Sequence, residues 1–267
     1  LEILRSVVAL KPDAMIVQDL GLVRLIREIA PEQVVHASTQ MTITNDLAIE
    51  LLKDLKIRRY VLGRENSLSE IKLISERSPA ELEVFVHGAL CVSYSGQCFT
   101  SEYLGGRSAN RGQCAQSCRL SYELYVDGEK YKDIEEKYLV SPKDLCGIAE
   151  VPELMKLGVK SFKVEGRLKT PEYVGSVAES FNKTIWSVLK ESPLTDSQLK
   201  QEMFKMAIPY SRGFFPGWLH GVSHQKLVDG HFNSNRGALL GKVVGAKSNS
   251  LLVTLDENYP LQPGDGI

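Results

Sequence analysis

Short apolar segments alternate with amphipathic segments of helical period along the first two thirds of the chain. The apolar segments are about five residues long and rich in β-branched and aromatic side chains, as buried parallel strands are. We expect five such strands, at 14–18, 34–38, 59–63, 82–87 and 161–165. Strands that alternate with helices in this way predict right-handed βα units and a parallel sheet.

The amphipathic segments predict the helices of these units. We expect helices at 1–10, 19–30, 45–55, 68–78, 141–157 and 171–190. Ser67 and Glu70 have the spacing of a capping box at the start of one helix. Ser141-Pro142 should begin the helix that carries Cys146, because proline is favoured in the first helical turn.

The pattern changes after the long helix. Residues 193–235 combine a capped short helix with an aromatic, Gly-rich stretch, and we interpret them as a linker of irregular structure. Residues 236–267 alternate apolar and polar positions around a Lys247-Ser248-Asn249 turn, which predicts the start of a small β-barrel domain. From the sequence we expect both ends of the chain to belong to a longer protein.

One loop holds four of the five cysteines. It follows the strand at 82–87, spans about residues 88–140, and contains a predicted hairpin at Asp127-Gly128. Thiolates gathered in this way select zinc or an iron–sulfur cluster. Six residues separate Cys91 from Cys98, fifteen separate Cys98 from Cys114, and three separate Cys114 from Cys118.

Several kinds of site could use these thiols. Disulfides are not expected, because a large soluble protein does not need such cross-links in a loop. Zinc sites usually show two close Cys-x-x-Cys pairs, whereas this uneven spacing favours a cluster wrapped by a long loop. We therefore expect an iron–sulfur cluster first, zinc second, and inert buried thiols third.

The loop also resembles a known family. The segments GALCVSYSGQC and RSANRGQCAQSC are similar to the signature of peptidase family U32, the collagenase-like proteins, and the similarity continues through HASTQMT, SPKDLC and KVEGR. The resemblance implies a TIM-type (β/α)8 barrel. The chain would then carry the last five βα units in residues 1–192, with three strands before Leu1. A doubly wound sheet is the alternative, but no Gly-rich phosphate turn follows any strand.

The resemblance also implies a chemistry. Characterised relatives are mostly oxygen-independent hydroxylases with a [4Fe-4S] cluster, which act on RNA bases or on ubiquinone precursors. The segment SEYLGGRSANRGQCAQSC is most similar to the branch that forms 5-hydroxycytidine in 23S ribosomal RNA, with prephenate implied as the hydroxyl donor. Hydroxylation of tRNA uridine or of a ubiquinone precursor, a metal-dependent peptidase and a non-catalytic assembly factor are the alternatives.

Composition adds limits to this hypothesis. With 43% hydrophobic and 24% charged residues, the chain has the balance of a globular protein, and no apolar run is long enough for a membrane span. The formal net charge of −1 means that ribosomal RNA, or an assembly precursor, would be held by a local patch. Clustered unpaired thiols indicate a reducing compartment, so we expect a cytoplasmic protein.

Function in a barrel of this type lies at the C-terminal ends of the strands. The resemblance makes Cys91, Cys98 and Cys114 the firm ligands, with Cys118 or else Cys146 as the fourth. The histidines could equally be core residues, and the loop arginines could be solvated or could bind RNA phosphate or a small carboxylate co-substrate. The catalytic candidates are His36, His87, Glu165 and Arg167, and the substrate-binding candidates are Gln40, Arg64, Arg107, Arg111 and Lys163.

Overall fold

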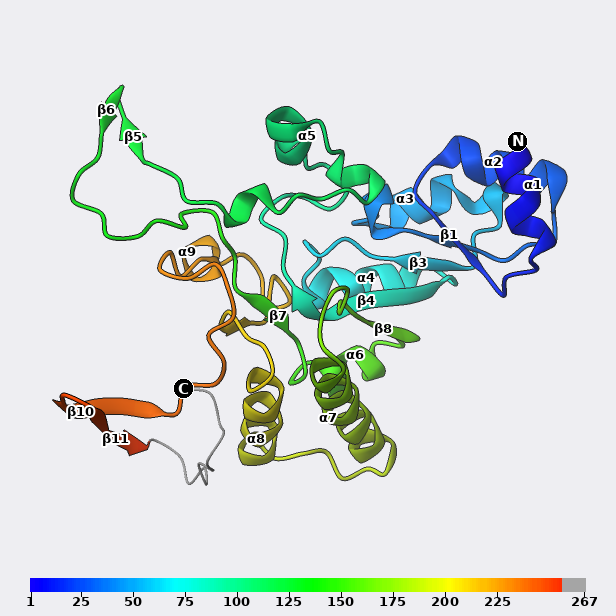
Figure 1. Ribbon diagram of the computed structural model, residues 1–267. Helices are drawn as coiled ribbons and strands as arrows, with labels where there is room; N and C mark the ends of the chain where they lie inside the picture. The colour runs from blue at the N-terminus through cyan, green and yellow to red at the C-terminus, as the bar shows by residue number, and fades with distance from the viewer. Residues whose placement is uncertain (256–267) are drawn as a thin grey trace.

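A mostly parallel sheet of seven strands organises the chain (Figure 1). The computed structural model describes residues 1–255. The five predicted strands are present and parallel, which confirms an α/β fold with a mostly parallel sheet. They are β1 (Met15–Val17), β2 (Val35–Ala37), β3 (Arg59–Val61), β4 (Glu81–Ala89) and β8 (Ser161–Val164).

Two further strands extend this sheet beyond β4. β7 (Asp144–Cys146) pairs antiparallel with the last residues of β4, and β9 (Phe214–Phe215) pairs parallel with β7. The strand order is β1-β2-β3-β4-β7-β9, and β8 pairs with β4 beside this path. Within residues 1–255 the sheet is therefore open, and β1, β8 and β9 are its edge strands.

Capped helices connect the strands. The side chain of Asp19 accepts from the backbone N–H of Leu22 at 2.7 Å, and the Ser67–Glu70 capping box is present as predicted. The helices are α1 (Glu2–Ala9), α2 (Leu20–Ile29), α3 (Asp46–Leu51), α4 (Leu68–Arg77), α5 (Thr100–Gly105), α6 (Val151–Lys156), α7 (Pro171–Leu189), α8 (Asp196–Ala207) and α9 (His224–Leu227). Four 3₁₀ turns are η1 (Thr39–Met41), η2 (Lys53–Leu55), η3 (Ala109–Arg111) and η4 (Ser117–Arg119).

The two faces of the sheet differ in character. One face presents apolar side chains such as Val35, Tyr60 and Leu82, which pack with helix residues into the main core. On the other face, strand neighbours bring charged groups together: Arg59 pairs with Glu81 at 2.8 Å, and Lys163 lies 3.7 Å from Glu83. Helices thus cover the first face. On the second face the charged groups gather toward the starts of the strands, and Val61 and Phe85 join a smaller hydrophobic cluster nearer their ends.

The prediction of a helix over 141–157 is wrong in its first half. Cys146 lies in β7, where it pairs with His87 of β4, and α6 begins only at Val151. All three residues of β7 are buried, so the segment gains its stability from pairing with a strand distant in sequence. A local pattern cannot reveal such pairing.

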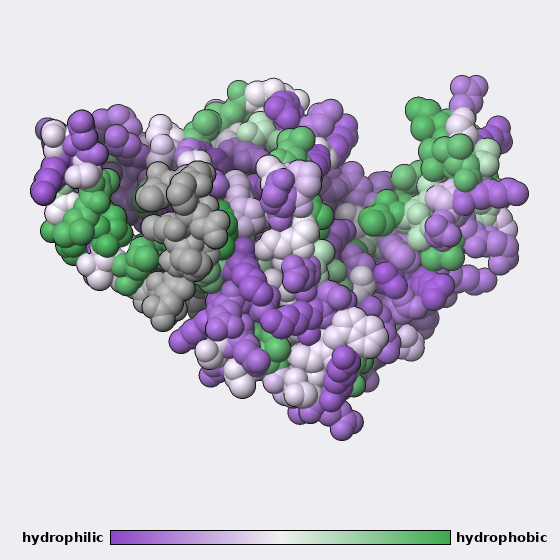
Figure 2. Space-filling model, turned by 60° about the horizontal axis from the view of Figure 1, so that its bottom comes forward, coloured by the Kyte–Doolittle hydropathy of each residue, from purple (hydrophilic) through white to green (hydrophobic). Residues whose placement is uncertain are grey.

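The remaining segments follow the sequence more closely. The Asp127-Gly128 turn joins β5 (Tyr125–Val126) to β6 (Glu129–Lys130), as predicted. The interval 193–235, interpreted as a linker, supplies α8, α9 and the sheet strand β9. β10 (Gly241–Lys247) and β11 (Ser250–Leu255) form the expected hairpin, and apolar side chains gather over it in Figure 2. The rest of the predicted β-barrel start, residues 256–267, lies outside the described residues.

Candidate functional site

The cysteine loop, residues 90–143, crosses the C-terminal ends of β2, β3 and β8. The loop therefore closes over the edge of the sheet where the sequence predicts a site. A set of hydrogen bonds holds it there: Gln40 Nε2 to Ala109 O at 3.2 Å, Thr42 Oγ1 to Ser95 O at 2.6 Å, Arg64 N to Ser95 Oγ at 3.1 Å, Ser95 N to the Glu65 carboxylate, and Arg167 Nη1 to Gly112 O at 3.5 Å.

Arg119 fastens the two ends of the loop to each other. Its buried guanidinium donates to the carbonyl of Leu90 at 3.3 Å, to the hydroxyl of Ser141 at 2.8 Å, and to the carbonyl of Pro142. Buried hydrogen bonds from a charged donor are among the stronger ones in proteins. The base of the loop is therefore fixed, and this arginine has a structural role.

A glycine allows the loop to leave the sheet. Gly88 has φ of +112°, and a Cβ atom added there would lie 2.5 Å from the carbonyl oxygen of Glu165. Only glycine combines this backbone conformation with so close an approach to β8. The approach brings the end of β8 against the start of the loop.

Four of the cysteines lie near one another, and all are free thiols. Burial raises the pKa values of Cys91 and Cys118. Cys98 and Cys114 raise both pKa values further, because nearby thiolates repel one another. Loop residues far apart in the sequence are thus electrostatic neighbours in the fold.

Cys146 stands apart from this group. It is buried in β7, and burial raises its pKa to about 12. The charges that act on it are those of Glu150 and Asp144 and not those of the loop thiols. Of the two predicted alternatives for the fourth ligand, Cys118 is therefore the one that lies with the other three.

The donor set can be compared with the groups that it is expected to hold. Within residues 1–255, no three His, Cys, Asp or Glu side chains are arranged to hold a single metal ion. Thiolates around one zinc ion converge to Zn–S distances of about 2.3 Å, whereas each thiolate of a [4Fe-4S] cluster binds a different iron. Four free thiols, with Arg64 near Cys91 and Arg119 near Cys118, fit an iron–sulfur cluster by their chemistry.

Arg64 places an unmatched positive charge beside the thiols. Its Nε is buried without a hydrogen-bond partner among the described residues, and its guanidinium lies 4.2 Å from the ring centroid of Phe85. Burial lowers its pKa, while Cys91, Glu65 and Glu165 act in the opposite sense. A buried arginine with a free donor is suited to a carboxylate ligand.

Glu165 and Arg167 do not pair through their side chains. The Glu165 carboxylate accepts from the backbone N–H of Arg167 at 2.9 Å, and the guanidinium of Arg167 reaches the carbonyl of Gly112 in the loop. The hydroxyl of Tyr173 donates to the backbone carbonyl of Glu165 at 3.1 Å. Both residues therefore lie at the end of β8 beside the loop.

The structure assembles a second polar group that the sequence analysis missed. Lys169 Nζ lies 2.9 Å from the ring centroid of Tyr210 and 5.8 Å from that of Tyr173. Burial, followed by the charge of Arg212, lowers the pKa of Lys169 to about 8. Lys169 comes two residues after Arg167, so its position shortly after a core strand is the signal in the sequence that indicates it.

Arg212 is itself held by a buried ion pair. Its Nε and Nη2 lie 3.0 and 2.5 Å from Asp144 Oδ1, and both side chains are almost completely buried. The pair joins the start of β7 to the segment just before β9. Asp144 is thus neutralised, and Lys169 has no carboxylate of its own in the described part of the chain.

His87 lies in the core. Its ring is 1% exposed and packs at 5.5–5.9 Å from the rings of Tyr173, Phe181 and Phe214. Neither ring nitrogen has a hydrogen-bond partner among the described residues, and burial lowers the pKa to about 4. His87 is therefore a neutral histidine in an aromatic environment.

The other predicted residues divide between the loop and the sheet. His36 is half-buried on the second face of the sheet, where burial and Arg59 lower its pKa, and Lys163 lies on the same face. Arg107 and Arg111 are exposed on the cysteine loop. The structure thus brings Gln40, Arg64, Glu165 and Arg167 to the loop, and leaves His36, His87 and Lys163 on or within the sheet.

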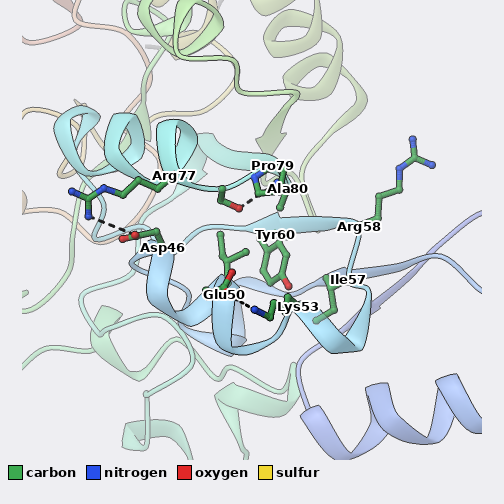
Figure 3. Close-up of a pocket in the computed structure, with 11 residues that line it drawn as sticks. Asp46, Glu50, Lys53, Ile57, Arg58, Tyr60, Arg77, Pro79 and Ala80 are labelled. Atoms are coloured by element: carbon green, nitrogen blue, oxygen red, sulfur yellow. Dashed lines mark hydrogen bonds and ion pairs between the residues drawn. The ribbon is translucent and has the colours of Figure 1, made fainter.

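A separate cavity lies at the opposite ends of the strands. It has a volume of about 390 Å³ and is lined by residues of α3, α4 and the starts of β3 and β4 (Figure 3). Arg77 lies 3.6 Å from Asp46 across it, and Lys53 pairs with Glu50. Its charges are matched, so we do not assign it to the site at the cysteine loop.

Among residues 1–255, none of the helices combines the length and the apolar character needed to traverse a bilayer.

Comparison with known proteins finds relatives across nearly the whole chain. Peptidase family U32 matches residues 1–229. The chain is 33% identical over 261 residues to "tRNA hydroxylation protein P1" of Bacillus subtilis, covering 95% of this chain and 61% of that protein. It is 34% identical over 267 residues to "23S rRNA 5-hydroxycytidine C2501 synthase" of Escherichia coli, covering 96% and 39%. It is 33% identical over 242 residues to "Collagenase" of Porphyromonas gingivalis, covering 81% and 58%.

Proposed function

Because the chain belongs to peptidase family U32, we propose that it is part of an iron–sulfur enzyme that hydroxylates a base in RNA without molecular oxygen. The observation that carries the proposal is the gathering of four free thiols, from one loop, over the ends of the parallel strands. The chain spans 61% and 39% of the two RNA-modifying relatives. RNA hydroxylation by the whole protein is therefore part of this proposal, and so is a complete TIM-type barrel.

The proposed ligands are Cys91, Cys98, Cys114 and Cys118. When bound, a [4Fe-4S] cluster would supply a Lewis-acidic, redox-active centre at the end of the sheet. Binding must displace the thiol protons, since burial raises the pKa values of Cys91 and Cys118. Arg64 and Arg119 assist this step, because each lowers the pKa of the cysteine beside it.

The residues around the loop suit an anionic co-substrate. Arg64 has a buried donor without a partner among the described residues, Lys169 forms no ion pair among them, and the charge of Glu165 acts on both cations. We propose that these two cations hold the carboxylate groups of a small hydroxyl donor, with prephenate as the candidate. Glu165 and Arg167 border the same edge, where a carboxylate can accept a proton from the reacting group.

The proposed substrate is RNA. A cytidine of 23S ribosomal RNA is the first candidate, and a uridine of tRNA is the second. The names of the two relatives, one acting on rRNA and one on tRNA, support RNA but do not choose between these targets. The base must be single-stranded or turned out of its helix to reach the loop, as in an assembly precursor. RNA and reduced thiols together fit a cytoplasmic location.

The test compares nucleosides from cells with and without the gene. Mass spectrometry of rRNA and tRNA should detect one hydroxylated pyrimidine that is lost on deletion and restored by the wild-type gene. Restoration should fail with Cys91→Ala and succeed with the matched variant Cys146→Ala. An unchanged nucleoside profile in the deletion strain would refute the RNA hydroxylase and leave a non-catalytic assembly factor or the ubiquinone pathway.

Metal content gives an independent test of the cluster. Protein reconstituted anaerobically should absorb broadly in the visible blue and bind about four irons per chain, as one [4Fe-4S] cluster requires. The absorption should be lost in Cys91→Ala. Colourless wild-type protein with one zinc per chain would show that the thiols hold zinc instead.

A peptidase is the second candidate, because one relative carries the name collagenase. The sequence contains no His-Glu-x-x-His helix and no Gly-x-Ser-x-Gly turn to support hydrolysis of peptides. Gelatin degradation by purified protein, unaffected by Cys91→Ala, would favour the peptidase.

A further inference from the structure

Two aromatic rings project into solvent at α5, which begins two residues after Cys98: Phe99 is the N-cap residue and Tyr103 lies within the helix. Phe99 is 65% exposed and Tyr103 is 90% exposed. The backbone N–H of Tyr103 donates to the carbonyl of Phe99 at 2.9 Å, so the two residues are one helical turn apart and their side chains lie on one face of α5. Neighbouring rings left in water forgo the stabilisation of burial, which is typical of a surface that binds a partner.

The opposite side of α5 is anchored to the rest of the cysteine loop. Ser101 is buried, its hydroxyl accepts from the backbone N–H of Ala115 at 3.1 Å, and it lies 3.4 Å from the hydroxyl of Ser117. Ala115 and Ser117 lie between Cys114 and Cys118 in the sequence. α5 is therefore anchored beside the proposed cluster ligands, on the side of the sheet away from α7 and α8 (Figure 1).

The charge around the rings favours a polyanion. Residues 91–120 contain three arginines and one acidic residue, Glu102. Arg119 is buried, whereas Arg107 and Arg111 are exposed and take part in no ion pair within the described residues. Exposed aromatic rings next to unpaired arginines are typical of single-stranded RNA surfaces, where bases stack on the rings and phosphates meet the guanidinium groups.

We propose that Phe99 and Tyr103 form a stacking platform for bases of single-stranded RNA, while Arg107 and Arg111 contact the phosphates. Bases stacked on the platform would bring a neighbouring nucleotide to the loop edge, because Phe99 directly follows Cys98. This inference rests on the proposed function for the choice of RNA. What it adds to that function is the place where the RNA binds, the exposed face of α5.

The platform can be tested by RNA binding to the full protein with its metal centre reconstituted. The probe is a pyrimidine-rich single-stranded oligonucleotide that carries 2-aminopurine, whose fluorescence reports stacking. Phe99→Ala and Tyr103→Ala should each weaken binding by about 5- to 150-fold, the effect of removing one stacked ring, and should reduce the fluorescence change. Phe99→Tyr and Tyr103→Phe should bind as the wild type does, because stacking needs the ring and not the hydroxyl.

Matched controls separate stacking from general damage. Trp186→Ala removes a ring that is 53% exposed on α7 and should leave the affinity unchanged. Iron content and thermal unfolding of the α5 variants should equal those of the wild type, since removing exposed rings creates no cavity. Equal RNA affinity in wild type and both alanine variants would overturn the platform, and so would a loss of self-association without a loss of RNA binding, which would indicate a protein contact.

The two hypotheses fail in different ways. If the wild type forms the hydroxylated nucleoside but binds RNA independently of the rings, the platform is wrong and the proposed function stands. If binding depends on the rings but no nucleoside changes in cells, the platform stands and the proposed function falls.

Discussion

Acidification should destabilise this protein through His87. The ring is almost fully buried among Tyr173, Phe181 and Phe214, and neither nitrogen has a partner in the described residues. Burial lowers the pKa from 6.5 to about 4, and the nearby charge of Asp144 opposes the shift only in part. The folded state therefore keeps His87 neutral at a pH where the unfolded chain is already protonated.

The sign and size of the effect follow from this difference. Between pH 6.5 and 4 the unfolded state binds one more proton than the folded state, so the free energy of unfolding falls as the pH falls. A shift from 6.5 to about 4 corresponds to about 3 kcal/mol over the whole interval, and to about 2 kcal/mol at pH 5. The stability is fully present above pH 6.5.

His87→Phe should remove this dependence. Phenylalanine fills a similar volume among the three rings and cannot bind a proton, so its stability at pH 7 should stay within about 1.5 kcal/mol of the wild type. Urea unfolding at pH 7 and pH 5 measures the loss on acidification, which should be about 2 kcal/mol smaller in the variant. His224→Gln, at an exposed histidine on α9, is the matched control and should behave as the wild type.

An equal loss in wild type and His87→Phe would refute the reasoning. It would mean that His87 reaches water or a partner in the folded protein. The activity of His87→Phe at pH 7 tests a separate question, whether His87 is catalytic. Retained RNA hydroxylation would make that predicted role wrong.

Three further predictions concern other buried groups. Asp144→Asn should lower the free energy of unfolding by about 3–5 kcal/mol in urea, because it leaves the buried Arg212 charge without a partner; Lys53→Ala, at an exposed ion pair, should leave the unfolding curve unchanged. The pKa of Lys169 is lowered from 10.5 to about 8, so the unfolded state binds more protons between these values, and stability should rise with pH across that window. Lys169→Met should abolish this rise, and an unaltered rise would place the charge elsewhere. Cys146→Ser should retain the iron of the wild type, measured by metal analysis, because Cys146 lies apart from the loop thiols.

Local patterns in the sequence were sufficient for the parallel part of the fold. The five strands, the Ser67–Glu70 capping box and the Asp127-Gly128 hairpin depend on periodicity and turn chemistry, which act over a few residues. The position of the cysteine loop was also predictable from the sequence, because all four of its thiols lie in one stretch that directly follows a core strand.

Contacts between distant segments could not be predicted in this way. β7 forms only because Asp144 and its neighbours pair with the end of β4, and β9 forms only against β7. Lys169 meets Tyr210 because the pairing of β9 with β7 brings the chain just before β9 beside the sheet, and no spacing in the sequence indicates that approach. His87 was placed correctly on its strand, but its aromatic surroundings come from α7 and β9.

The paired register of Ala89 with Asp144 has an architectural consequence. The chain leaves the sheet after Ala89 and returns to it at Asp144, so the segment between them is an insertion whose two ends are fixed side by side. Such an insertion can change in length or sequence while the β4–β7 pairing stays intact, because the entropic cost of closing a loop grows slowly with its length. One scaffold could in this way acquire different substrates by exchanging the insert alone, and grafting the insert of a tRNA-modifying relative onto this sheet would be a route to redirect it.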